Sequence, residues 1–147
     1  MVTVKNQPWY AFTDPSKSDL SSVPKILVPD IAEHNRFAFD SGEFFPLNSA
    51  YYIVPKDINP HFLTALLNSV PIEFLIRLRA PIAKDRFSRY RRQFLAPLPI
   101  PTPTPAQERE ITEAVGVGDF ATAHQRCTDL FGLTAEELTV INAYLSR

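Results

Sequence analysis

The chain has 147 residues, of which 45% are hydrophobic, and a formal net charge of -1; these values suit one compact globular domain and exclude a disordered chain. A single cysteine excludes an internal disulfide, and no apolar run approaches the roughly 20 residues that span a bilayer, so we expect a cytoplasmic protein without a membrane partner. Fourteen prolines against four glycines leave no glycine-rich loop that could cradle a nucleotide cofactor.

The N-terminal residues carry an aromatic group followed by a polar loop. Trp9, Tyr10 and Phe12 precede the turn signal Asp14-Pro15. The initiator methionine is followed directly by a sequence typical of the middle of a domain. We therefore expect this chain to be one piece of a longer protein.

Three short strands are predicted in the first third of the chain. Residues 25–28 are mainly apolar, residues 36–39 alternate between apolar and other types, and residues 50–54 are rich in β-favouring side chains. An Asp-Ser-Gly-Glu stretch at residues 40–43 predicts a hairpin connection. Short strands joined in this way predict a small mixed or antiparallel sheet.

A helix is predicted to begin at Pro60, because Asn59 is a favoured N-cap and proline in the first turn loses no hydrogen bond. Its apolar stripe has helical spacing and consists of Phe62, Leu63, Leu66, Leu67 and Val70. Pro71 then interrupts the pattern. Residues 72–78 fit either a second helix or a strand, and we favour the helix.

Residues 77–92, called the basic segment below, concentrate positive charge. The segment has seven cations and one acid, so its local charge is +6 and the rest of the chain sums to -7. The seven cations are Arg77, Arg79, Lys84, Arg86, Arg89, Arg91 and Arg92. A solvated surface is the simpler explanation for such a run, but a one-sided basic face is typical of proteins that meet polyanions.

The composition of the basic segment favours the second explanation. Six of its seven cations are arginines, whose planar fork suits phosphate oxygens or a guanine edge. Aromatic residues are interleaved with them and can stack on bases or anchor the segment to a core. We expect core positions for Phe87 and Phe94, and leave both roles open for Tyr90.

Beyond the basic segment we expect residues 94–100 to form a strand, followed by a stiff spacer with proline at every second position from 97 to 105. Three helices are then predicted, capped at Thr104, Asp119 and Thr134. Residues 102–147 hold seven acids and three bases and should face away from a polyanion. We therefore divide the chain into residues 1–101 and a C-terminal helical part, residues 102–147.

Several stretches together resemble a known family. They are Trp9-Tyr10, residues 24–31, Phe62-Leu63-Thr64-Ala65-Leu66-Leu67-Asn68-Ser69, Arg89-Tyr90, Leu98-Pro99-Ile100-Pro101 and residues 129–137. In this order and spacing they resemble the TaqI-like C-terminal specificity domain, the target-recognition part of adenine-specific DNA methyltransferases that include type IIG restriction-modification enzymes. The resemblance covers most of the chain and implies an α+β fold with a helix packed on the small sheet.

The resemblance also implies two partners, double-stranded DNA and the catalytic methyltransferase domain of the same polypeptide. S-adenosylmethionine is expected in that missing domain, since this chain lacks the family's Asn/Asp-Pro-Pro-aromatic motif; Asn59-Pro60-His61 is not one. We therefore expect no cofactor and no catalysis from this chain alone. Whether the parent enzyme also cleaves DNA stays open.

Other constellations give weaker hypotheses. His124 and Cys127 are three residues apart and could share a zinc ion, but no second pair of ligands accompanies them, so we expect no metal and a core position for Cys127. Asp30, Glu33 and His34 could serve a small metal-dependent nuclease. That alternative lacks the acid that should stand two residues before Lys56 or Lys84.

The predicted DNA-binding residues form two groups. Phosphate or guanine contacts are expected from Arg77, Arg79, Arg86, Arg89, Arg91 and Arg92, with Lys84 and Tyr90 beside them. Loops between strands are expected to supply base readers, namely Arg36, Asn48 and Ser49. A protein-interaction module that docks its arginines on an acidic partner is the principal alternative.

Overall fold

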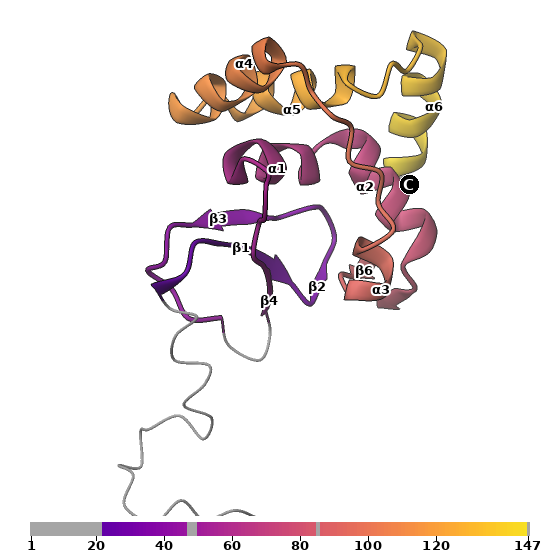
Figure 1. The fold of residues 1–147 in the computed structure, drawn as a ribbon. Helices are drawn as coiled ribbons and strands as arrows, with labels where there is room; N and C mark the ends of the chain where they lie inside the picture. The colour runs from indigo at the N-terminus through magenta and orange to yellow at the C-terminus, as the bar shows by residue number, and fades with distance from the viewer. Residues whose placement is uncertain (1–21, 47–49, 85, 147) are drawn as a thin grey trace, which may run out of the picture.

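The computed structural model describes residues 22–46, 50–84 and 86–146 (Figure 1). These residues form two small antiparallel sheets and six helices, which confirms the predicted α+β class. In the first sheet β1 (Lys25–Pro29) lies between β3 (Ala38–Asp40) and β4 (Ala50–Ile53). All three strands fall where the sequence predicts them.

The predicted hairpin at residues 40–43 is wrong, because β3 and β4 do not pair with each other and lie on opposite edges of β1. Asp40 makes a tight turn instead: its carboxylate accepts hydrogen bonds from the N–H groups of Gly42 (3.2 Å), Glu43 (2.9 Å) and Phe44 (3.3 Å). Gly42 has φ 112°, and a Cβ there would lie 2.9 Å from the Ser22 carbonyl. Only glycine fits that position without a shift of the backbone.

Helix α1 (Pro60–Leu67) covers one face of the first sheet (Figure 1). The Asn59 side chain accepts from the N–H groups of His61 (2.9 Å) and Phe62 (3.3 Å), as expected of an N-cap. Helix α2 (Val70–Arg79) follows, so the helical interpretation of that stretch is confirmed. Within the described residues no single helix is long and apolar enough to cross a bilayer; α1 and α2 pass that test only as a pair bent by 61°.

The basic segment contributes two strands to a second sheet, an outcome that the sequence did not indicate. Its order is β2 (Ile31–Ala32), β6 (Phe87–Arg89) and β5 (Ile82–Lys84). The strand expected at residues 94–100 is wrong. Helix α3 (Arg92–Leu95) begins there instead, and the prolines that follow it lack the N–H groups that a sheet ladder needs.

Three capped helices complete the fold, α4 (Pro105–Gly116), α5 (Phe120–Asp129) and α6 (Ala135–Leu145), as predicted. Helices α4 and α5 pack on α1, on the side away from the sheet, and α6 packs on α2 (Figure 1). Ile111 and Cys127 are fully buried in the same core as Ile26 of the sheet and Leu66 of α1. The boundary at residues 101/102 stays a prediction, since the two parts share this core.

Burial defines the roles of two titratable side chains. It raises the pKa of the Cys127 thiol to about 12, so this residue is an unreactive part of the core. Asp40 on the edge strand β3 forms a buried ion pair with Lys25 on the central strand β1. Burial alone would raise the pKa of the Asp40 carboxyl, but the hydrogen bonds from Lys25 and from three backbone N–H groups outweigh it and lower the pKa to about 2.

We expect Asp40→Asn to lower the thermal unfolding midpoint by roughly 10 °C, because it leaves the Lys25 ammonium buried without a counter-ion.

The folded pKa of Asp40, about 2, lies below its ordinary value of 3.8. The stability that Asp40 contributes is therefore present above pH 3.8 and is lost as the pH falls through about 2. Urea unfolding from pH 5 to pH 2 should show a larger loss in the native chain than in the variant, which keeps its other paired carboxylates. Glu136→Gln, at an exposed position, is the control, and equal unfolding midpoints for the two variants would contradict the expectation.

Candidate nucleic-acid interface

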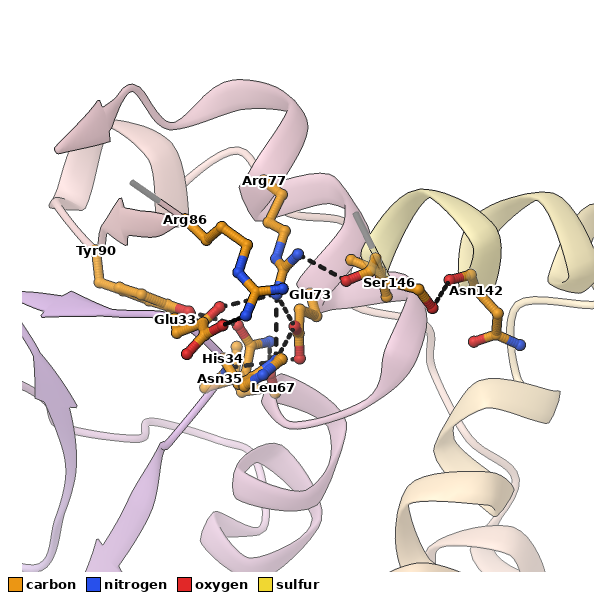
Figure 2. A network of polar contacts seen from close by, with 11 residues as sticks. Glu33, His34, Asn35, Leu67, Glu73, Arg77, Arg86, Tyr90, Asn142 and Ser146 are labelled. Carbon is orange, nitrogen blue, oxygen red and sulfur yellow. Dashed lines mark hydrogen bonds and ion pairs between the residues drawn. The ribbon is translucent and has the colours of Figure 1, made fainter. Parts of the chain in front are cut away.

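Arg77 links three separate parts of the chain (Figure 2). Its guanidinium donates hydrogen bonds to the carbonyl of Leu145 at the end of α6 and to the carbonyl of Glu33 after β2, each 2.9 Å long. It also pairs with the Glu73 carboxylate at 3.1 Å, one turn earlier on α2. The side chain is 11% exposed, so Arg77 holds the fold together and we leave it out of the interface.

Tyr90 is also an internal residue, with 1% of its surface exposed. Its hydroxyl donates to the side-chain oxygen of Asn35 at 3.0 Å, and its ring meets Phe37 edge-to-face at 5.7 Å. Burial, with a smaller contribution from the charge of Glu73, raises the pKa of the phenol. The phenol thus stays neutral and enclosed, and we leave Tyr90 out of the interface as well.

The loop between β2 and β3 is held by side chains from both neighbouring helices. The Asn68 amide donates to the Phe37 carbonyl at 2.8 Å and accepts from the Phe37 N–H at 3.0 Å. The Asn35 amide donates to the Leu67 carbonyl at 2.6 Å, and His34 contacts the Glu73 carboxylate at 2.9 Å (Figure 2). These contacts fix the loop while its Arg36 side chain is exposed to solvent.

Two arginines of the basic segment are paired with carboxylates from the β2 region. Arg86 lies 2.7 Å from Glu33, and Arg89 lies 3.6 Å from Asp30. Arg86 is 58% exposed, so its carboxylate partner orients the guanidinium without removing it from the surface. Asp30, Glu33 and His34, the residues of the nuclease alternative, therefore contact Arg89, Arg86 and Glu73 respectively.

The remaining predicted contacts differ in their surroundings. Arg36, Arg91 and Arg92 are exposed and form no ion pair with any carboxylate that the structure describes. Arg79 is exposed and donates to the Pro97 carbonyl at 3.0 Å. Lys84 lies on β5, with its side chain outside the described part, and positions 48 and 49, which are Asn48 and Ser49, also lie outside it.

Comparison with known families decides what kind of domain this is. Residues 4–100 match the model of the TaqI-like C-terminal specificity domain. The chain belongs to this family. The match ends within one residue of the boundary expected at residue 101, and α4, α5 and α6 lie beyond it.

Three type II methyltransferases are similar to this specificity domain. M.PaeR7I of Pseudomonas aeruginosa is 28% identical over 90% of the chain and 24% of the methyltransferase. M.BstVI of Geobacillus stearothermophilus is 32% identical over 59% of the chain and 16% of the methyltransferase. M.XhoI of Xanthomonas vasicola is 26% identical over 95% of the chain and 26% of the methyltransferase. The chain thus spans about a quarter or less of the length of these relatives.

The specificity domain exposes two apolar side chains beside its arginines. Ile31 is paired with Arg89 across β2 and β6, so the two side chains share a face of the second sheet, and Phe87 shares that face two residues along. Ile31 and Phe87 are each 40% exposed, so the core position expected for Phe87 is wrong; Phe94 does pack against the core. Burial alternates along residues 87–90, since Ser88 and Tyr90 are buried whereas Phe87 and Arg89 are solvent-accessible. This alternation with a period of two is the strand pattern that the sequence analysis did not identify.

Arg77→Ala should cost about 2–4 kcal/mol of folding stability, because it leaves the Glu73 carboxylate and two carbonyl groups without their partner. Arg91→Ala, which removes an exposed arginine nearby, should change stability by less than about 0.5 kcal/mol. Urea unfolding followed by circular dichroism measures both. Equal free energies of unfolding for the two variants would show that Arg77 has no structural role.

Proposed function

We propose that this specificity domain recognises the DNA target for a restriction-modification adenine DNA methyltransferase. The observation that carries the proposal is the group of solvent-accessible guanidinium groups on and beside β6 and α3. Arg86, Arg91 and Arg92 are exposed, Arg89 among them is partly buried, and Arg36 and Arg79 are exposed as well. Family membership and the methyltransferase relatives support the same assignment.

Net charge supports a polyanionic partner even after internal pairing is counted. Arg36 and the six arginines of the basic segment stand against three described carboxylates of this region, Asp30, Glu33 and Glu73, which leaves four positive charges. Helices α4 and α6, which carry net negative charge, and the neutral α5 lie over α1 and α2, at a distance from β6 and α3 (Figure 1). A duplex is therefore attracted to the β6 and α3 end of the domain.

In the proposed mechanism, contacts to phosphates supply affinity and contacts to base edges supply sequence specificity. Phosphate oxygens replace Glu33 as the partner of Arg86 and Asp30 as the partner of Arg89. Because these carboxylates already hold both side chains in place, little side-chain entropy is lost on binding. Phosphate contacts set the register of the domain on the duplex. Base edges are then read by Arg36, by the guanidinium groups that reach a groove, and by Lys84, Asn48 and Ser49, which stay predictions.

Ile31 and Phe87 add an apolar contact between the arginines. Exposed apolar side chains on a basic surface can pack on a thymine methyl group or on sugar edges, contacts that carry sequence information without charge. The sheet fixes both side chains on the same face as Arg89.

The rest of the polypeptide supplies the chemistry in this proposal. The catalytic domain binds S-adenosylmethionine and extracts the target adenine, and the specificity domain determines which adenine is presented. Gly116 ends α4 and Gly118 lies in the turn before α5, so neither belongs to a cofactor loop after a strand.

Binding to a mixed-sequence duplex should depend steeply on salt. If about five phosphates are neutralised, log K against log salt has a slope near -4 to -5, and replacing Arg89, Arg91 and Arg92 together by Ala should reduce its magnitude by about 2 to 3. Fluorescence anisotropy from 50 to 300 mM salt measures the slope. Arg109→Ala, on the acidic helix α4, is the control and should leave it unchanged. A slope unaffected by the triple substitution would refute the proposed surface.

Phe87→Ala should weaken binding to a duplex selected from a random-sequence library by roughly tenfold, because about one side chain's apolar contact is lost. The salt slope should stay as it was, since no charge changes. Phe44→Ala removes a more exposed phenylalanine (62% against 40%) far from the basic segment in sequence and serves as the control. Equal affinities for Phe87→Ala and Phe44→Ala would place Phe87 outside the interface.

A further inference from the structure

A second feature of the domain has the properties of a ligand site. A pocket of about 580 Å³ lies between β3, α1, the end of α4 and the first turns of α5. This is within the range of about 300–1,000 Å³ that holds small organic ligands. Helix α1 lies between β3 on one side and α4 and α5 on the other (Figure 1). The lining residues run from Arg36 to His124, so parts of the chain that are distant in sequence build the pocket.

The charged and polar groups of the pocket favour an anion. Among the lining residues that the structure describes there is no aspartate or glutamate, whereas Arg36, His61 and His124 all line the pocket. Of these, Arg36 and His61 are exposed to solvent. Burial lowers the pKa of His124, so its imidazole is neutral at pH 7 and can donate or accept a hydrogen bond. The amide of Asn68, another lining residue, is already engaged by the backbone of Phe37.

The ring systems of the pocket favour a flat, uncharged group beside that anion. The rings of Phe39 and His61 lie 4.5 Å apart at 60°, and those of Phe120 and His124 lie 6.5 Å apart at 35°. One pair belongs to β3 and α1 and the other to α5, so aromatic surface is offered from two sides of the pocket. Phe120 is 56% exposed although it is a large apolar residue. Aromatic surfaces of this kind stack on nucleobases without regard to sequence.

We propose that this pocket binds an unpaired nucleotide, with its base against the Phe39–His61 and Phe120–His124 pairs and its phosphate at Arg36. Two sources share this chemistry, a free mononucleotide and a nucleotide unstacked from bound DNA, and the second source rests on the proposed function. The base is held by stacking and by the neutral His124 imidazole. The phosphate is held by the guanidinium, which has no carboxylate partner among the described residues.

Titration calorimetry on the whole chain tests the site with defined probes. Adenosine 5′-monophosphate should bind at least fivefold more tightly than adenosine or inorganic phosphate, because only the nucleotide uses both halves of the pocket. His61→Ala and Phe120→Ala should each weaken nucleotide binding roughly tenfold. Val117→Ala, in the turn between α4 and α5 but not among the lining residues, is the control and should bind normally. Phe120→Leu gives a second variant, and circular dichroism verifies that each variant is folded.

Duplex probes distinguish the two sources of nucleotide. A duplex with a one-nucleotide bulge should bind more tightly than the fully paired duplex, and Phe120→Ala should remove that difference. Binding of adenosine monophosphate with no preference for the bulge would instead assign the pocket to free nucleotides. If neither the mononucleotide nor the bulge binds better than its control, the pocket proposal is overturned. Failure of the proposed function would give a different result: the paired duplex would show no salt-dependent binding, while the mononucleotide would still bind.

Discussion

The loop between β2 and β3 depends on hydrogen bonds from side chains that are far away in sequence. Asn68 holds both polar backbone groups of Phe37, and Arg77 holds the carbonyl of Glu33. A short loop of this kind cannot satisfy its own backbone groups, so the helix side chains replace the missing partners. With the loop fixed, Arg36 and the pair Glu33–Arg86 occupy defined positions at the surface.

The same contacts divide five arginines of the basic segment into three classes. Arg77 is nearly enclosed and serves the fold, whereas Arg91 and Arg92 are exposed and free of described ion pairs. Arg86 and Arg89 are intermediate, because a carboxylate holds each one but solvent still reaches it. A count of charges in the sequence treats all of them alike, so it overstates the charge that is available to a partner.

Local signals explain which parts of the fold the sequence could predict. Helix starts were recovered because the cap and its partner lie within three residues, as in Thr104 with Gln107 and Thr134 with Glu137. The β5–β6 pairing was missed because the arginines concealed an alternation that only the burial of Ser88 and Tyr90 makes plain. Long-range pairs such as Asp30 with Arg89 have no sequence signature at all. The pocket was missed for the same reason, since its lining comes from residues 36 to 124.

The hydrogen bond from Arg77 to the carbonyl of Leu145 bears on how such domains could be exchanged between enzymes. The family match stops at residue 100, yet Ile111 and Cys127 fill the same interior as the sheet. A chimera cut at the edge of the family match would strip α1 and α2 of their cover and expose apolar surface to water. Transplants that aim to change target preference should carry the segment through α6 as one unit with the rest.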